Sequence, residues 1–301
     1  MGRTGSLLLF CAAIALAQQQ PPKFKARVDL ALFDVEVLDR DGAPVADLTR
    51  EDFVAVENGK PREISNFAWQ SDRPVSLVMV LDTSGVPVEQ LVSAKRFVTR
   101  LAHVLAPDDE VALMSFDHRD AYLEIEFTRN RPSLIDVLEN IEVPYSRKRT
   151  LLRELYGQTP RTGLAVDLAL DQLRKGRNDK RAVLLISNRF KGLGPVTTEH
   201  VTAAGATLMT VTMGDRSKLR VILRGDPKQE RELVQESGGR QFSGDGADTG
   251  PTCRAIARSL KNHYTLGVLV DPGSSDKDRR KIEVKVPGKD YLVLARRSYE
   301  R

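Results

Sequence analysis

The chain has 301 residues, of which 29% are charged and 41% are hydrophobic, and its formal net charge is +5. This length is enough for one sizeable domain with a smaller partner. The excess of positive charge is mild and aromatic residues make up only 6% of the chain. Together these values argue against a nucleic-acid-binding surface, so no nucleic-acid partner is expected.

Residues 1–17 are predicted to be a secretory signal peptide. A short basic start precedes the apolar stretch Ser6–Ala17, which ends in an Ala-x-Ala cleavage site. The stretch is shorter than the roughly 20 residues that a membrane-spanning helix needs. We therefore expect an exported protein, secreted or periplasmic, that is not inserted in the membrane after cleavage. Cys253 would then be the remaining cysteine, and a packed thiol is favoured over a nucleophile.

Residues 24–72 are predicted to form an N-terminal β segment. Its first strand is expected over residues 28–39. Two further strands, 53–57 and 62–67, flank Asn58-Gly59, which is a strong signal for a hairpin. Thr49 can cap a short helical turn that precedes them.

Residues 74–262 show a different rhythm, in which apolar strands alternate with amphipathic helices. The strands are predicted over 75–81, 110–116, 122–127, 182–186 and 207–213, and the helices over 88–105, 133–141, 163–173, 227–237 and 251–262. Such alternation is typical of an α/β fold with a doubly wound, mostly parallel sheet.

Residues 263–301 form a C-terminal β segment, with strands predicted over 263–270, 281–286 and 291–296. Three strands are too few to form a stable domain without further partners. We therefore expect them to pair with residues 24–72. The small β unit would then be discontinuous, with the α/β domain inserted between its two segments.

The most informative motif is the end of the strand predicted over 75–81, where Asp82, Thr83 and Ser84 follow a continuous apolar run. The absence of polar alternation indicates a strand buried on both faces of a parallel sheet. Such sheets bind ligands at the carboxyl ends of their strands, and carboxylate and hydroxyl oxygens suit Mg²⁺ or Ca²⁺. The alternative is that Asp82 and Ser84 only cap the next helix.

This motif resembles the first segment, Asp-x-Ser-x-Ser, of the metal-ion-dependent adhesion site (MIDAS) of von Willebrand factor type A (VWA) domains. Nearly the whole mature chain resembles the VWFA-related, acidobacterial-type family of secreted bacterial proteins. The matching stretches include 35–45, 48–53, 57–61, 81–85, 109–113, 236–240, 263–267 and 296–299. The resemblance implies a VWA domain flanked by β strands, and such domains usually bind proteins.

The resemblance also implies a set of metal ligands drawn from three segments. Asp82 and Ser84 belong to the first segment. Thr162 is the candidate in the second, with Thr159 as its alternative, and Asn188 is the candidate in the third. Thr162 could equally act as a helix N-cap, which needs a hydroxyl at the same place.

Three residues depart from the family pattern. Val86 stands where a second hydroxyl is expected, Asn188 replaces an aspartate, and Arg189 replaces a glycine. Only Asp82 would then supply a carboxylate, and affinity for a hard cation depends on the number and charge of its oxygen ligands. The metal-free form is therefore favoured over a form that holds Mg²⁺, Mn²⁺ or Ca²⁺.

The predicted function is a protein-binding module that uses the strand-end face of its VWA domain, with a degenerate MIDAS. The sequence names no partner. The first alternative is a structural subunit of a cell-envelope assembly, whose edge strands pair with a neighbour. A hydrolytic enzyme is a less favoured alternative, because no motif for a serine nucleophile, a zinc protease, a phosphate loop or a redox dithiol is present. We expect no enzymatic activity.

Overall fold

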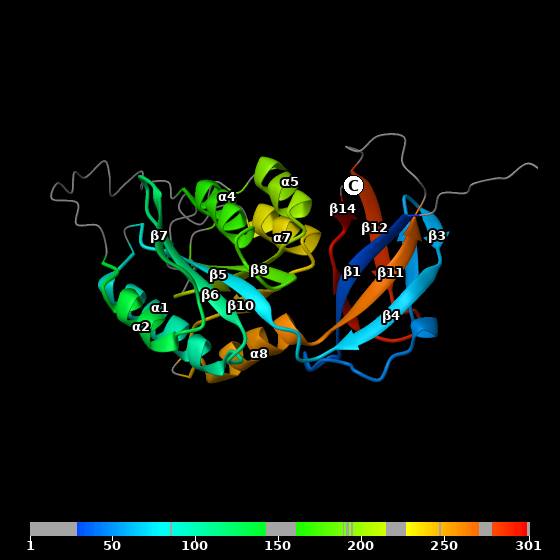
Figure 1. Cartoon of the computed structure of the whole chain (residues 1–301), viewed down its shortest axis with the longest axis horizontal. Helices are drawn as coiled ribbons and strands as arrows, with labels where there is room; N and C mark the ends of the chain where they lie inside the picture. Colours follow the sequence, from blue (N-terminus) through cyan, green and yellow to red (C-terminus); the bar gives the residue numbers. More distant parts are fainter. Residues whose placement is uncertain are drawn as a thin grey trace, which may run out of the picture.

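The computed structural model describes residues 29–84, 86–142, 161–188, 190, 193, 195–214, 227–246, 248–270 and 279–299. Figure 1 shows two parts side by side, an α/β domain built on a six-stranded sheet and a β unit built from two four-stranded sheets. The predicted signal peptide lies outside the described residues. None of the described helices has the length and apolar character needed to span a membrane.

The six-stranded sheet has the order β10-β9-β8-β5-β6-β7. Its strands pair in parallel, except that β7 runs antiparallel to β6 at one edge. Every residue of β5 is buried, as the lack of polar alternation predicted. The strands are β5 (Val75–Asp82), β6 (Glu110–Phe116), β7 (Ala121–Thr128), β8 (Lys180–Ser187), β9 (Thr207–Thr212) and β10 (Gln241–Ser243).

Helices cover both faces of this sheet and form a separate apolar core with each. One face packs against α1 (Val88–Val104), α2 (Arg131–Glu139) and α8 (Gly250–Lys261). The other packs against α4 (Thr162–Leu173), α5 (Pro195–Ala203) and α7 (Pro227–Glu236). The sequence did not predict α5 or β10, because each is short and takes its shape from the elements it packs against.

The β unit joins strands from both ends of the described chain. Its sheets have the orders β13-β1-β11-β4 and β14-β12-β2-β3, and their apolar side chains form a third core. The strands are β1 (Asp29–Leu38), β2 (Val54–Glu57), β3 (Lys60–Arg62), β4 (Ile64–Gln70), β11 (His263–Val270), β12 (Arg280–Lys285), β13 (Leu292–Ala295) and β14 (Ser298–Tyr299). β1 pairs with β11 and β13, so segments more than 200 residues apart are neighbours.

Local turn chemistry in the β unit follows the sequence. Asn58 and Gly59 have positive φ values of 47° and 80° between β2 and β3, which is the backbone of a type I′ hairpin turn. Thr49 precedes a short 3-10 helix (Arg50–Asp52), and its N–H donates to the Asp52 carboxylate at 2.8 Å. The predicted helical turn and the Asn58-Gly59 hairpin turn are thus both present. The prediction of one strand over 62–67 is wrong, because Lys60–Arg62 pairs with β2 and Ile64–Gln70 pairs with β11 in the other sheet.

Polar side chains tie the two parts together where the chain passes between them. The Lys180 ammonium at the start of β8 lies 2.9 Å from the Asp34 carboxylate of β1. The Ser259 hydroxyl of α8 donates to Glu36 of β1 at 2.6 Å. The buried imidazole of His263 lies 3.4 Å from the same Asp34 carboxylate. These contacts gather around β1, and a second contact lies at the end of α7, where the N–H of Arg297 donates to the carbonyl of Glu236 at 3.0 Å.

Acidification is expected to weaken the fold through His263. Burial lowers the pKa of this imidazole to about 4, helped by Lys180 and opposed by Asp34. In the unfolded chain the His263 imidazole has an ordinary pKa of about 6.5. Between about pH 6.5 and pH 4 it is therefore protonated in the unfolded chain and neutral in the folded chain. Stability is therefore lost as the pH falls from about 6.5 to about 4, and the loss between about pH 7 and pH 5 is roughly 2 kcal/mol.

Urea unfolding of the wild-type protein and of His263→Gln at both pH values measures this contribution. The variant should lack that part of the loss. Burial raises the pKa of Glu36, which makes its own contribution run in the opposite direction, and it is common to both proteins. Equal losses in the two proteins would rule out His263 as the source.

Candidate functional site

Asp82 lies at the carboxyl end of β5 and is only 3% exposed. One carboxylate oxygen accepts hydrogen bonds from the backbone N–H of Ser84, at 2.8 Å, and from the Ser84 hydroxyl. The other accepts from the Ser187 hydroxyl of β8 at 2.5 Å. Both oxygens therefore receive donors, which satisfies a buried carboxylate. The same contacts fix the loop after β5 against the neighbouring strand.

Hydrogen bonds bring the ends of β5 and β6 and the start of α4 to one edge of the sheet. The N–H and hydroxyl of Thr83 donate to the carbonyl of Phe116, at 2.8 and 3.0 Å. The N–H of Arg161, which precedes α4, donates to the carbonyl of Asp117 at 3.2 Å. This edge thus gathers the segments that carry Asp82 and Thr162, as expected for a parallel sheet.

Two predicted site residues keep a buried oxygen without a hydrogen-bond partner. Thr162 is fully buried at the first position of α4, and its hydroxyl oxygen has none. The amide oxygen of Asn188, which follows β8, also has none, although its nitrogen donates to Gln90 at 3.0 Å. Buried polar atoms are seldom left in this state. These two oxygens are therefore available to a water molecule or a cation.

The structure corrects the alternative role given to Thr162. The N-cap of α4 is Arg161, and no side chain there makes a capping hydrogen bond. The Thr162 hydroxyl is thus not used to cap its helix. Thr159 and Arg189, the other residues considered for this edge, lie outside the described residues.

Three residues of this edge were not predicted as site residues. Ser187 meets Asp82 because β5 and β8 pair in register, with Leu81 opposite Ile186. Asp117 is 2% exposed after β6 and accepts from the N–H groups of Arg119 and Asp120. Ser187 directly follows the strand predicted over 182–186, and Asp117 directly follows the strand predicted over 110–116. Their position at strand ends was therefore a signal that the sequence already contained.

Gln90, the third of these residues, is placed by α1. Its side-chain amide donates to the carbonyl of Met213, at 2.5 Å, and accepts from Asn188. It therefore links α1 to the ends of β8 and β9. A glutamine in the first turn of an amphipathic helix is ordinary, and nothing in the sequence marked it.

Val86 places an apolar side chain where the family pattern has a hydroxyl. It is 8% exposed and lines a cavity of about 10 Å³ together with Asp82, Gln90 and Asn188. A cavity of this size holds about one water molecule. Val86 therefore adds no ligand to the small space beside the carboxylate.

The four candidate ligands have the type of atom that a hard cation prefers, but they carry little negative charge. Asp82, Ser84, Thr162 and Asn188 offer carboxylate, hydroxyl and amide oxygens, which Mg²⁺ and Ca²⁺ accept. Asp82 is the one carboxylate among these four, and both its oxygens already accept hydrogen bonds. In the part of the chain that the structure describes, no three His, Cys, Asp or Glu side chains are grouped to hold a metal ion.

Cys253 is expected to resist thiol reagents while the protein is folded. The side chain is fully buried in α8, and burial raises the pKa of the thiol to about 11. A buried thiol that stays protonated reacts slowly, because the thiolate is the nucleophile. Titration with a chromogenic disulfide should label this residue only after denaturant is added; rapid labelling of native protein would contradict the burial.

We compared the chain with known protein families and proteins. The fold and its strand-end cluster define a doubly wound α/β domain whose ligands are expected at the carboxyl ends of the strands. Residues 77–191 match the family model of the von Willebrand factor type A domain, so the chain contains a domain of this family. A search of the curated proteins gave no match.

Three solved structures illustrate the similarity. An aerotolerance-related membrane protein from Bacteroides fragilis is 18% identical, with 62% of this chain and 98% of that chain covered and a TM-score of 0.48. A von Willebrand factor type A protein from Catenulispora acidiphila is 10% identical, with coverages of 92% and 74% and a TM-score of 0.49. The manganese-loaded TRAP protein of Plasmodium vivax is 11% identical, with coverages of 76% and 96% and a TM-score of 0.42.

Proposed function

We propose that this protein is an exported binding protein that holds a protein partner on the strand-end edge of its VWA domain. The role is binding and not catalysis. Membership of the VWA family supports interaction with other proteins as the general function. The choice of this edge rests on the side chains that surround Asp82.

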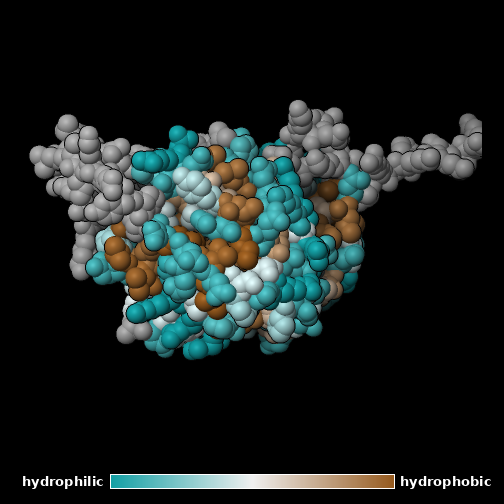
Figure 2. Space-filling model, turned by 60° about the vertical axis from the view of Figure 1, so that its left-hand side comes forward, coloured by the Kyte–Doolittle hydropathy of each residue, from teal (hydrophilic) through white to brown (hydrophobic). Residues whose placement is uncertain are grey.

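Exposed apolar side chains flank the polar cluster, and this observation carries the proposal. Val88, at the first position of α1, is 64% exposed. Tyr122 and Leu123 are 43% and 42% exposed at the start of β7, where they pair with the last residues of β6. Protein interfaces combine such apolar anchors, often aromatic, with a polar rim. Figure 2, which turns this side of the molecule toward the viewer, shows apolar surface between hydrophilic areas.

The edge strand β7 adds a second means of contact. It is the outermost strand of the sheet and pairs only with β6 among the described strands. An exposed edge strand offers backbone N–H and C=O groups to an extended segment of another protein. Glu124 and Glu126 lie on the same strand, so a partner segment with basic residues would be matched in charge.

A pull-down from envelope extract tests the binding edge and the structural alternative together. The bait proteins are the wild type, Tyr122→Glu in the VWA domain, and Leu292→Glu in the β unit as a matched control. Leu292 is 52% exposed on β13 and lies far from Asp82 in the fold. We expect the wild type and Leu292→Glu to retain the same partner and Tyr122→Glu to lose it. Loss in Leu292→Glu alone would favour a structural subunit that docks through its β unit.

We propose further that the partner is held without a metal at ordinary cation concentrations. If Mg²⁺ binds, Asp82, Ser84, Thr162 and Asn188 are the residues that would hold it. A bound cation would supply a positive charge to which an acidic side chain of the partner could be attracted. Without it, the orphan oxygens of Thr162 and Asn188 accept hydrogen bonds from water or from the partner.

Calorimetric titration with Mg²⁺ and Mn²⁺ checks this expectation. We expect no saturable heat below about 1 mM, since an oxygen site with a single carboxylate should have a dissociation constant at or above the weak end of the range for oxygen-ligand sites, about 10⁻³ M. Capture of the partner should likewise persist in EDTA. Saturable heat at lower concentration that disappears in Asp82→Ala would instead establish the metal-bound form.

Export is proposed from the sequence of residues 1–17. The basic start, the apolar stretch and the Ala-x-Ala site support a cleavable signal peptide. Expression of the full chain with N-terminal sequencing of the extracytoplasmic product tests it. The mature protein should begin at Gln18, and recovery of intact chain in the cytoplasm would contradict export.

A further inference from the structure

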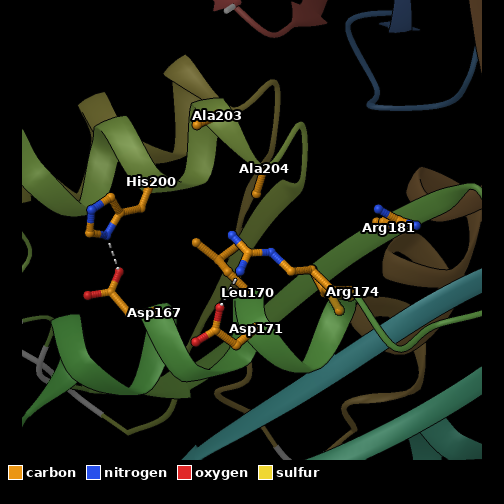
Figure 3. A pocket seen from close by; sticks show the side chains of 9 residues that line it. Asp167, Leu170, Asp171, Arg174, Arg181, His200, Ala203 and Ala204 are labelled. Atoms are coloured by element: carbon orange, nitrogen blue, oxygen red, sulfur yellow. Dashed lines mark hydrogen bonds and ion pairs between the residues drawn. The ribbon is translucent and has the colours of Figure 1, made fainter.

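A second concave site lies between α4 and α5, beside the start of β8, and has a volume of about 470 Å³ (Figure 3). The charged and titratable side chains that line it are Asp167, Asp171, Arg174, Arg181 and His200. Arg181 is the second residue of β8, whereas Ser187 ends the same strand. Six residues of extended chain separate them, which is roughly 20 Å. The pocket is therefore distinct from the strand-end edge.

Arg181 is the unusual member of this group. The side chain is partly buried, and its Nε atom is shielded from solvent and has no hydrogen-bond partner. No ion pair or hydrogen bond joins its side chain to any other described residue. A buried N–H group without an acceptor is unfavourable, although the rest of this guanidinium is only partly buried. The pocket thus contains a positive charge that lacks a partner.

The other charged side chains of the pocket are already paired. The Arg174 guanidinium lies 2.9 Å from the Asp171 carboxylate, and His200 Nδ1 lies 2.8 Å from Asp167. Two carboxylates and two guanidinium groups line the pocket, so its formal charges balance when His200 is neutral. Arg181 is nevertheless the lining guanidinium that no described carboxylate pairs with. Guanidinium groups present parallel N–H donors that match the two oxygens of a carboxylate or a phosphate.

The layout of the pocket suggests the shape of its ligand. Figure 3 shows the His200–Asp167 pair at one end and Arg181 at the other, with Leu170, Ala204 and the Asp171–Arg174 pair between them. The middle of the pocket thus offers apolar side chains next to an ion pair. The volume falls within the range of pockets that bind small organic molecules and is larger than a single ion would fill.

We propose that this pocket binds a small amphipathic acid. Its oxyanion contacts the Arg181 guanidinium, its apolar body lies against Leu170 and Ala204, and its far end reaches the His200–Asp167 pair. A carboxylate and a phosphate monoester share the required chemistry. This ligand site is independent of the proposed protein-binding edge, and either could fail without the other.

Titration of the full chain with hexanoate and with hexyl phosphate, followed by NMR of the arginine Nε–H signals, tests the proposal. Hexanol and hexylamine serve as neutral and cationic controls. We expect at least one acid to shift a single arginine signal saturably, and the signal to be absent in Arg181→Gln. Loss of a charge-assisted hydrogen bond should weaken binding of that acid tenfold or more in this variant. The acid that binds more tightly shows whether the site prefers a carboxylate or a phosphate.

Two further variants make the result decisive. Arg177→Gln removes an exposed positive charge just before β8 and outside the pocket, and it should bind the acid as the wild type does. Ala204→Phe fills the apolar middle and should abolish binding while Arg181 remains. The proposal is overturned if neither acid binds at millimolar concentration, if Arg181→Gln binds equally well, or if hexanol binds as tightly as the acids.

Discussion

Replacing Asp109 with alanine is expected to lower the free energy of unfolding by about 4 kcal/mol. The carboxylate is fully buried at the start of β6 and forms an ion pair with Lys261 at the end of α8. It also accepts from the N–H groups of Val75, at 3.0 Å, and Ala106, at 2.8 Å. Its removal would leave a buried ammonium and two N–H groups without their partner, which costs far more than losing an exposed pair.

Urea unfolding followed by circular dichroism measures this change. Asp108→Ala is the matched control, because Asp108 is the neighbouring carboxylate and is exposed. The control should stay within about 0.5 kcal/mol of the wild type. A similar, small effect in both variants would show that the buried pair contributes little to stability.

Gly239→Ala is the second change with a large expected effect, a loss of about 3 kcal/mol or more. A Cβ atom at this position would lie 1.8 Å from the carbonyl oxygen of Leu208. The obstacle is backbone, so no side chain can rotate to relieve it. Gly239 also donates its N–H to Val234 at 2.9 Å, which closes the end of α7. The substitution must therefore displace α7 from β9.

Gly59→Ala separates this steric effect from backbone strain. Gly59 has a positive φ of 80° in the β2–β3 turn, but nothing lies within 4 Å of a Cβ added there. Its substitution should cost only about 1 kcal/mol, the price of a left-handed backbone for alanine. Thermal unfolding of the two variants should thus show a much lower midpoint for Gly239→Ala, and equal midpoints would contradict the steric argument.

The strands and helices of the α/β domain were predictable because burial leaves a direct mark on sequence. β5 has no polar residue before its end apart from Ser76, and α1 repeats its apolar residues at helical spacing. The elements that were missed are short and depend on tertiary pairing. β10 has three residues that pair with β9, and β14 has two that pair with β12. Local sequence cannot specify such strands, since their partners are distant.

The candidate site was predictable in position and not in detail. The strand-end rule placed Asp82 and Ser84 at the edge where the structure has them, and the helix start placed Thr162. The hydrogen bond from Ser187 to Asp82 follows from strand register. In contrast, the link from Gln90 to Asn188 and the orphan oxygen of Thr162 depend on how α1 and α4 sit against the sheet. Side-chain patterns along one chain do not carry that information.

The insertion of the α/β domain has a mechanical consequence. The chain leaves the β unit after Gln70 and returns at His263, and these two residues are paired opposite each other on β4 and β11. The α/β domain is therefore a side branch that the chain enters and leaves at adjacent points, and the end of α7 also contacts the β unit through the bridge between Ser237 and Arg296 and the ion pair between Glu236 and Arg279. Tension applied between β1 and β14 would run through the sheets of the β unit and would reach the α/β domain only through these contacts of α7. A partner bound at Asp82, by contrast, would pull on the branch and load the Asp109–Lys261 pair at its base.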